Sequence, residues 1–467
     1  MYNQLKNKIH NNNIFVCMLL IVTVFFLIYV SSASANVVFM DYWRYLNTLV
    51  DKMYTTGVTF HDLYSSNGVH RSPVQLFIFL CNVRFFHLNP QIDVYLGAIM
   101  LAVQCCILYK EYKKDMNVRQ SAYYYLGIAG VILAVFSLGQ WEILTTEFSF
   151  SAGIGRTLTI LSFFWTNRLL KKMEGLSGRA LELALLYVFI ICGVKGMFFL
   201  GYGCALVVII IWDFLQRSKE EKRKYFKTYI ILGVGLLCGA ILYLYGLDMG
   251  SSNGGTIHGL SFATVISLLK SYIIMMGASM IGTAAPAYAV EGCGIFLSLF
   301  TIYCIFVYFN KQFYKNTYFP MLLIISTIAI VFVIWVGRGE RFNIWYLASS
   351  RYICDTKMMM VADIWIMMLY LQTKQMEKKD KKEWVKCIAN IGLVIVMLSG
   401  IIITDKMEWD IKGYRKAYYN QIIEKMRNID SLKEEEFANF QANNPDMVRE
   451  GVAIMKKYKL NIYYYED

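Results

Sequence analysis

Hydrophobic residues occur along the chain in long blocks, separated by shorter stretches that are rich in polar and charged residues. Each block is close to the ~20 residues that a helix needs to cross a ~30 Å hydrocarbon layer. The blocks cover residues 14–30, 92–109, 122–139, 150–167, 180–194, 197–215, 228–246, 292–309, 319–336, 352–371 and 387–404. The alternating pattern of a membrane β-barrel is absent from the sequence. The pattern therefore predicts an all-α, polytopic bundle of about eleven transmembrane helices.

Two further apolar stretches carry charged residues within them. Arg84 and His87 interrupt residues 73–90, and Lys270 lies at the middle of residues 261–283. A lysine or arginine at the centre of a spanning helix costs about 2.5–3.5 kcal/mol on insertion scales. A helix that lies in the membrane interface keeps its charge among the headgroups and avoids this cost. We expect both stretches to be interfacial helices, although the sequence leaves open whether they cross.

Composition and charge placement indicate how the chain is oriented. The 467 residues are 57% hydrophobic and carry a formal net charge of +13. The basic residues concentrate in short connections, at residues 110–119, 168–179, 217–227 and 374–386. Basic short loops stay in the cytoplasm. The charge therefore indicates orientation rather than a nucleic-acid partner, and we expect a multi-pass cell-membrane protein with a cytoplasmic N-terminus and an extracytoplasmic C-terminus.

This orientation places four polar segments on the outer face of the membrane, at residues 31–91, 140–149, 247–291 and 337–351. Residues 405–467 follow the last span and are also outside. Their helical periodicity predicts two or three short helices. The predicted organisation is a membrane domain over residues 1–404, with interfacial helices in its first outer loop at 31–91, and a small helical tail over 405–467.

The first outer segment begins with the motif MDYWRY at residues 40–45. Tyr42, Trp43 and Tyr45 are of the types that form aromatic belts at membrane interfaces, so we expect them to hold Asp41 at the level of the lipid headgroups. A carboxylate in that position can act as a base toward a hydroxyl that approaches from outside. The alternative is a solvated loop residue with no catalytic role.

The same loop contains the sequence His70-Arg71-Ser72-Pro73 before the first interfacial helix. Proline suits the first turn of a helix. A helix N-terminus beside an arginine and a histidine is suited to an anion such as phosphate. The pattern thus predicts that His70 and Arg71 bind an anionic group, and the alternative is a surface helix that binds nothing.

The second outer segment contains Gln140-Trp141-Glu142, with Glu147 five residues further on. No basic residue lies within this short segment. The acids are expected either to be paired with arginines from elsewhere in the chain or to form a second acidic site. Trp141 is expected at the membrane interface.

The last outer segment holds three arginines, Arg338, Arg341 and Arg351, and ends at Tyr352. Arginines on the outer face run against the orientation bias, which indicates that they have partners. A phosphate or pyrophosphate group is the simplest partner, because the guanidinium fork matches phosphate oxygens. Ion pairs with the outer acids are the alternative. Arg156 belongs with this group, because a charge inside a predicted span is by default functional.

These motifs, together with the order in which they occur, resemble the GT-C superfamily of membrane glycosyltransferases. That superfamily has a first span, an outer-face aspartate beside aromatic residues, and a long first outer loop with interfacial helices. MDYWRY, VHRSP, GQWE and SSRY look like a group of GT-C-like proteins encoded with bacterial surface polysaccharide genes. In that group an acid usually precedes the histidine-arginine pair, and here Val69 stands in its place. The resemblance covers about residues 14–371.

The resemblance implies transfer of a sugar from a polyprenyl-phosphate carrier to a glycan or lipid-linked acceptor at the outer face. Asp41 would be the base or would help to hold a divalent metal, and Glu142 would be a weaker second carboxylate. Whether a metal is needed stays open. The remaining candidates would bind the substrates, and the arginines among them would stabilise the leaving phosphate; the full set is His70, Arg71, Trp141, Arg338, Arg341, Arg351 and Tyr352.

Two other functions fit parts of the sequence. A surface polysaccharide polymerase or ligase also uses outer arginines on lipid-linked chains, but it would be expected to place its decisive residues in a large late loop. A transporter or flippase for lipid-linked glycans would need a polar path through several spans. Only Arg156, Lys195 and Lys357 hint at such a path.

Overall fold

The computed structural model describes residues 2–65, 70–116, 121–194, 196–247, 261–338, 344–376, 381–442 and 444–464. Within these residues the regular elements are helices, which confirms the predicted all-α fold. The long helices are α1 (Tyr2–Ala33), α6 (Pro90–Asp115), α7 (Ala122–Phe136), α9 (Phe148–Lys171), α11 (Ala180–Gly193), α12 (Phe199–Gln216), α13 (Lys219–Leu244), α14 (Phe262–Ile281), α15 (Ala287–Asn310), α16 (Phe319–Arg338), α17 (Ser350–Met376) and α18 (Lys381–Asp410).

Ten helices in the described part of the chain are long and apolar enough to cross a membrane, by length and composition. They include α14, which the sequence placed in the interface, and they omit α9 and α17, which were predicted to cross. Both omitted helices are long but contain polar residues, among them Arg156 in α9 and Lys357 and Asp363 in α17, all three buried. A helix that is surrounded by other helices needs less apolar surface, because its polar groups find partners inside the protein.

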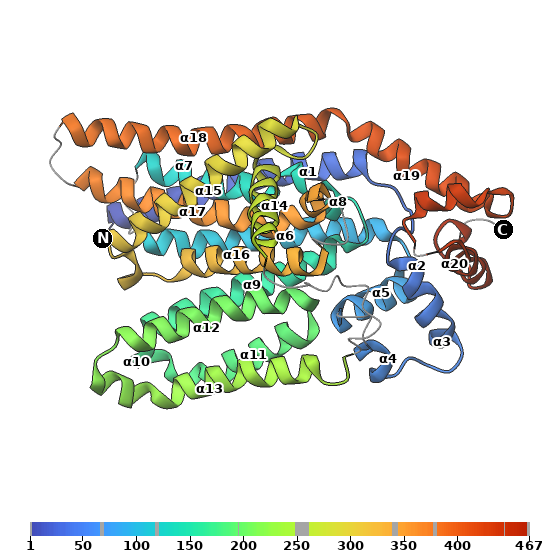
Figure 1. Cartoon of the computed structure of the whole chain (residues 1–467), viewed down its shortest axis with the longest axis horizontal. Helices are drawn as coiled ribbons and strands as arrows, with labels where there is room; N and C mark the ends of the chain where they lie inside the picture. Colours follow the sequence, from blue (N-terminus) through green and yellow to red (C-terminus); the bar gives the residue numbers. More distant parts are fainter. Residues whose placement is uncertain are drawn as a thin grey trace.

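The long helices run side by side, and the two ends of the chain lie at opposite ends of this bundle (Figure 1). The helices of the first loop and of the C-terminal tail lie at the end where the chain finishes: α2 (Tyr42–Tyr45), α3 (Asp51–Tyr54), α4 (Phe60–Tyr64), α5 (Pro73–Phe86), α19 (Lys412–Arg427) and α20 (Pro445–Lys457). The placement of the two termini on opposite sides of a membrane stays a prediction. Which side is cytoplasmic stays a prediction.

The two stretches expected at the interface both form helices. α5 has 14 residues, and at about 1.5 Å per residue it is too short to cross. α14 has 20 residues and is drawn steeply across the long helices rather than along them (Figure 1). The interfacial position of α14 stays a prediction, because its length and composition also allow a crossing.

The C-terminal tail shares one hydrophobic core with the first outer loop. Residues 35–88 of the loop and residues 419–463 of the tail form this second core, separate from that of the bundle. The backbone N–H of Met40 donates to the carbonyl oxygen of Phe440 at 3.3 Å, and the N–H of Asn461 donates to that of His87 at 2.7 Å. We call this combined unit the outer cap. The sequence predicted the tail as an appended element and did not predict this joint core.

The outer cap corrects the interpretation of the aromatic residues in MDYWRY. Tyr42, Trp43 and Tyr45 are all buried. The Trp43 ring meets Phe440 of the tail edge-on, with the ring centroids 5.4 Å apart. A Cβ added at Gly451 of α20 would lie 2.8 Å from Cε3 of Trp43. The three aromatic side chains therefore hold the Asp41 segment by packing inside the protein, and not as a belt among lipid headgroups.

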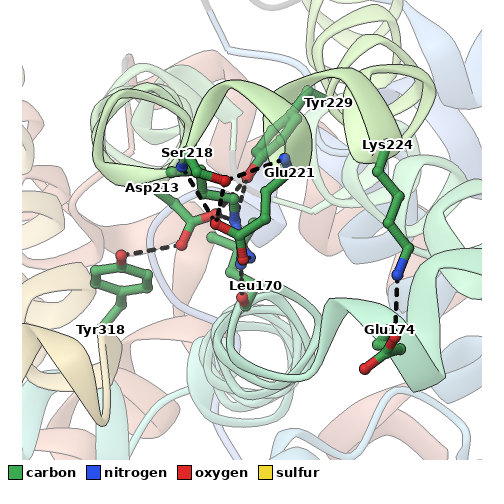
Figure 2. Close-up of polar contacts among 9 residues, drawn as sticks. Leu170, Glu174, Asp213, Ser218, Glu221, Lys224, Tyr229 and Tyr318 are labelled. Atoms are coloured by element: carbon green, nitrogen blue, oxygen red, sulfur yellow. Dashed lines mark hydrogen bonds and ion pairs between the residues drawn. The ribbon is translucent and has the colours of Figure 1, made fainter.

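A polar network surrounds Asp213, near the C-terminal end of α12 (Figure 2). The Tyr318 hydroxyl donates to Asp213 Oδ1 at 2.9 Å. Tyr229 of α13 and Arg217 donate to Asp213 Oδ2, with the Arg217 Nε at 3.0 Å. Arg217 also donates to the carbonyl oxygen of Leu170 at the end of α9. Because every group has a partner, we interpret this network as a structural junction of α9, α12, α13 and α16.

Candidate functional site

Asp41 lies at the start of α2, and its side chain is 52% exposed. Its Oδ1 is 3.5 Å from Nη1 of Arg44, a residue of the same motif that the sequence analysis did not assign to the site. The charge of Asp41 also acts on His70 and on Arg351, which come from distant parts of the sequence. Arg351 Nη1 lies 4.0 Å from the sulfur of Met40. The fold thus brings the first and the last predicted clusters together.

Arg351 is held against the GQWE motif. Its Nη1 lies 3.5 Å from Glu142 Oε1. The Ser350 hydroxyl donates to Glu142 Oε2 at 3.2 Å and accepts from the Glu142 backbone N–H at the same distance. Glu142 therefore has the ion-pair partner that the sequence left open, and it orients Arg351. This contact fits a positioning role for Glu142 better than the predicted role of a second catalytic carboxylate.

Aromatic rings flank the Arg351 guanidinium. Its Cζ lies 5.1 Å from the centroid of the Tyr346 ring and 5.3 Å from that of Tyr352. One terminal nitrogen donates to the Tyr346 hydroxyl. The Nε has no hydrogen-bond partner among the described residues. The Tyr352 ring thus flanks the guanidinium, and its contact with a substrate stays a prediction.

His70 and Arg338 belong to the same region, because the charge of Arg338 acts on the His70 ring. Burial, reinforced by Arg338 and opposed by Asp41, lowers the pKa of His70. A lowered pKa favours the neutral imidazole at neutral pH. His70 therefore offers a hydrogen-bonding nitrogen to a ligand, and its binding of an anionic group stays a prediction.

Arg71 does not take part in the cluster, which corrects its predicted role in binding an anion. It is only 3% exposed. Its terminal nitrogens donate to the carbonyl oxygens of Leu242, Tyr243, Tyr245 and Gly246, at 2.6–3.3 Å. These are the last carbonyl groups of α13 and the residues just after it, which lack partners within the helix. Arg71 therefore caps α13, and these bonds occupy its two terminal nitrogens.

Trp141 is also engaged within the protein. The guanidinium of Arg415 from α19 lies over its ring, 3.4 Å from the centroid. Arg415 in turn forms a two-point ion pair with Glu408, with Nη2 2.9 Å from Oε2. This arrangement ties the second outer segment to the tail, so the ring face that was predicted to bind a substrate is covered by Arg415.

Glu147 is the residue of the site that the sequence analysis named but did not select. It precedes α9, is buried, and neither of its carboxyl oxygens has a hydrogen-bond partner among the described residues. Burial, with the neighbouring carboxyl groups of Asp41, Asp93 and Glu142, raises the pKa of Glu147 well above its usual value. This shift favours the neutral, protonated form of Glu147. The sequence could not predict this difference between Glu142 and Glu147. The spacing of the two residues does not show which of them is paired with Arg351.

A large apolar cavity lies beside the Asp41 segment. Its volume is 1030 Å³, and α4, α5, α6, α9, α11 and α13 all contribute to its lining. Phe77, Val188 and Phe150 are typical of the lining, and Asp93 and Asn82 are among its few polar groups. The Tyr42 hydroxyl donates to Asp93 Oδ2 at 2.9 Å. Tyr42 thus connects the wall of the cavity to Asp41, the residue before it.

The predicted divalent metal can be tested against the donor groups near Asp41. Among the described residues, no three His, Cys, Asp or Glu side chains are grouped so that they could hold a metal ion. The residues around Asp41 therefore do not fit a resident metal, and no step below involves one. Arg341, Glu340, Val69 and Lys195 lie outside the described residues.

No family model matches the chain, and no curated protein is significantly similar to it. The fold and composition define a polytopic α-helical membrane protein. The geometry of the outer end is therefore the basis for any functional assignment.

Proposed function

We propose that this protein is a membrane glycosyltransferase that moves a sugar from a polyprenyl-phosphate carrier to a hydroxyl group of a glycan or lipid-linked acceptor. One observation carries the proposal. An exposed aspartate, Asp41, lies among cationic groups, and the next residue, Tyr42, is hydrogen-bonded to Asp93 in the wall of an apolar cavity of 1030 Å³. A substrate that combines a long apolar tail, a phosphate group and a reactive sugar fits this combination of surfaces.

Each part of the substrate has a counterpart in the protein. The isoprenoid tail lies in the cavity, whose lining is mostly aliphatic and aromatic. The phosphate lies near Arg44 and Arg351, and the buried Nε of Arg351 has no acceptor among the described residues. Arginine suits this task because its planar donors match phosphate oxygens. The neutral His70 adds a hydrogen bond.

The reaction uses Asp41 as a general base. The acceptor hydroxyl transfers its proton to the Asp41 carboxylate, and its oxygen forms a bond to the anomeric carbon of the sugar. The bond between that carbon and the carrier phosphate breaks, and the phosphate leaves with the bonding electron pair. General-base catalysis contributes about 10²–10⁴-fold, and charge stabilisation of the leaving group supplies a further part of the rate enhancement.

A polymerase or ligase acting on lipid-linked glycan chains is the second candidate. It is favoured by Arg338 and Arg351, which belong to the late outer segment and lie in the same cluster as Asp41. The two functions differ in their products. A transferase adds one sugar per carrier consumed, whereas a polymerase or ligase transfers a chain whose length exceeds one repeating unit.

The position of the carrier can be tested with a photoactivatable polyprenyl phosphate and purified protein in nanodiscs. Val188 lines the cavity, so Val188→Trp should fill part of it and reduce cross-linking. Val234→Trp on α13 is the matched control, because Val234 is exposed and does not line the cavity. Cross-linking that is equal in both variants, or that maps to residues remote from the cavity, would contradict the proposal.

A further inference from the structure

Two arginines are buried in the described part of the protein beside the outer cap, and their surroundings differ. Arg71 is 3% exposed and donates four hydrogen bonds to carbonyl oxygens at the end of α13, while its Nε has no partner among the described residues. Arg156 lies on α9 and is 5% exposed. Its one hydrogen bond within the described residues runs from Nη1 to Gln140 Oε1, at 3.1 Å, and its Nε has no partner there.

The environment of Arg156 does not balance its charge. A guanidinium carries five N–H donors and stays charged in proteins. Gln140 is neutral, and no carboxylate of the described residues forms an ion pair with Arg156. A buried charge that lacks a partner is strongly unfavourable, because desolvation is not offset by attraction. A charge inside a spanning helix is therefore expected to serve a ligand or a pathway.

A second buried cation, Lys357 of α17, lies close enough for the charge of Arg156 to act on it. Its Nζ donates to the Ser137 hydroxyl and to the carbonyl oxygen of Ser279, both at 2.8 Å. Asp405 attracts Lys357, but it accepts hydrogen bonds from Ser137 Oγ and from the backbone N–H of Leu138, both at 2.7 Å. Asp405 and Lys357 thus act on one another, and no carboxylate of the described residues pairs with the positive charge of Arg156, which stays in excess.

This excess charge lies next to the candidate site. Gln140, which orients Arg156, ends the turn η2 (Leu138–Gln140). Two residues further on, Glu142 pairs with Arg351. Lys357 follows Arg351 on the same helix, about 9 Å further along it at ~1.5 Å per residue. The cationic groups therefore continue from the exposed outer end into the bundle.

We propose that Arg156, oriented by Gln140 and assisted by Lys357, forms a second anion site that takes a phosphate group between α9, η2 and α17. Phosphate suits the site because its several charged oxygens can contact a guanidinium and an ammonium group at once. The phosphate comes either from a lipid carrier or from a free phosphate or pyrophosphate ion. The lipid source rests on the proposed function, whereas binding of the anion itself does not.

The test compares Arg156→Met with Arg71→Met by thermal unfolding of purified protein in detergent. Each variant is measured alone, with inorganic pyrophosphate, and with polyprenyl phosphate. Without an anion, Arg156→Met should unfold at the same temperature as the wild type or higher, because it removes an unbalanced buried charge. It should lose the increase in unfolding temperature that the anion gives the wild type. Arg71→Met should unfold at a lower temperature and keep that increase.

Other outcomes separate the sources or overturn the proposal. An Arg156-dependent increase with polyprenyl phosphate alone identifies a lipid source, and an increase with pyrophosphate as well identifies a site open to free ions. Arg156→Lys, which keeps the charge but loses the fork, should retain part of the increase. A lower unfolding temperature for anion-free Arg156→Met, or no Arg156-dependent increase with either anion, overturns the proposal. Since no transfer is measured, a failed transferase test would leave this result unchanged.

Discussion

Replacement of Glu147 by glutamine should change how the stability of the protein depends on pH. Glu147 is buried without hydrogen-bond partners among the described residues, and burial raises its pKa well above the usual value of 4.5. The carboxyl groups that act on it are those of Asp41, Asp93 and Glu142. It also interacts with three tyrosine hydroxyls, those of Tyr42, Tyr45 and Tyr419. In the unfolded chain the same side chain ionises at its usual pKa. The folded state therefore holds a proton that the unfolded state has lost.

The sign and size of the effect follow from this difference. Between the unfolded and the folded pKa, the folded protein binds one more proton than the unfolded chain, so its stability decreases as the pH rises. The decrease is about 1.4 kcal/mol per pH unit for a single group. Glutamine has nearly the same shape and does not ionise. The stability of Glu147→Gln relative to the wild type should therefore increase by this amount with each pH unit.

Paired thermal unfolding in detergent, between about pH 5 and pH 8, measures this slope. For a chain of this size the two unfolding temperatures should diverge by about 1–2 °C per pH unit. A difference between the two unfolding temperatures that is the same at every pH does not test the prediction. The buried glutamine amide has a desolvation cost of its own, which does not depend on pH. Glu174→Gln is the matched control, since the Glu174 side chain is 84% exposed. Parallel pH profiles for wild type and Glu147→Gln would refute a neutral buried Glu147.

Three further predictions concern the architecture. Asp213→Ala should destabilise the protein by about 3–5 kcal/mol, because it removes the buried carboxylate that Arg217, Tyr229 and Tyr318 share and leaves Arg217 only Glu221 as an ion-pair partner. Chemical unfolding would measure the loss, and an unchanged midpoint would contradict the junction. Gly451→Val should loosen the outer cap by about 1–3 kcal/mol, since the Cβ meets the Trp43 ring, and limited proteolysis should release the tail sooner than in the wild type. In a background without reactive native cysteines, a cysteine at exposed Glu435 should react with a membrane-impermeant thiol reagent in intact cells, and one at exposed Lys219 should not; the reverse result would invert the orientation.

The helices could be predicted because their signal is local. Each hydrophobic block became part of one long helix. The side chain of Asp41 is exposed, and its place on the outer face stays a prediction. The polarity of α9 and α17 was also visible in the sequence. The sequence did not show that other helices enclose α9 and α17, which is why these two helices can carry so many polar residues.

The parts that could not be predicted depend on contacts between distant residues. Arg71 caps α13, whose end lies more than 170 residues further along the chain. Trp43 packs against Phe440 and Gly451, which belong to a segment that the sequence presented as a separate tail. Which of two nearby glutamates pairs with Arg351 is decided by helix packing. Local patterns carry no information about such pairs, so the roles of these residues had to come from the structure.

The most direct test of the proposed transferase is the lipid profile of cells that carry Asp41→Asn in place of the wild-type residue. The substitution keeps size and most hydrogen bonds but removes the base, so transfer should fall by about two to four orders of magnitude. The lipid-linked sugar donor should then accumulate, and mass spectrometry of extracted polyprenyl-linked lipids detects this accumulation whichever sugar the carrier bears. Protein level and thermal stability are measured in the same cells, because the exposed Asp41 contributes little packing. An unchanged profile of polyprenyl-linked lipids, with Asp41→Asn protein present at the wild-type level, would contradict the account.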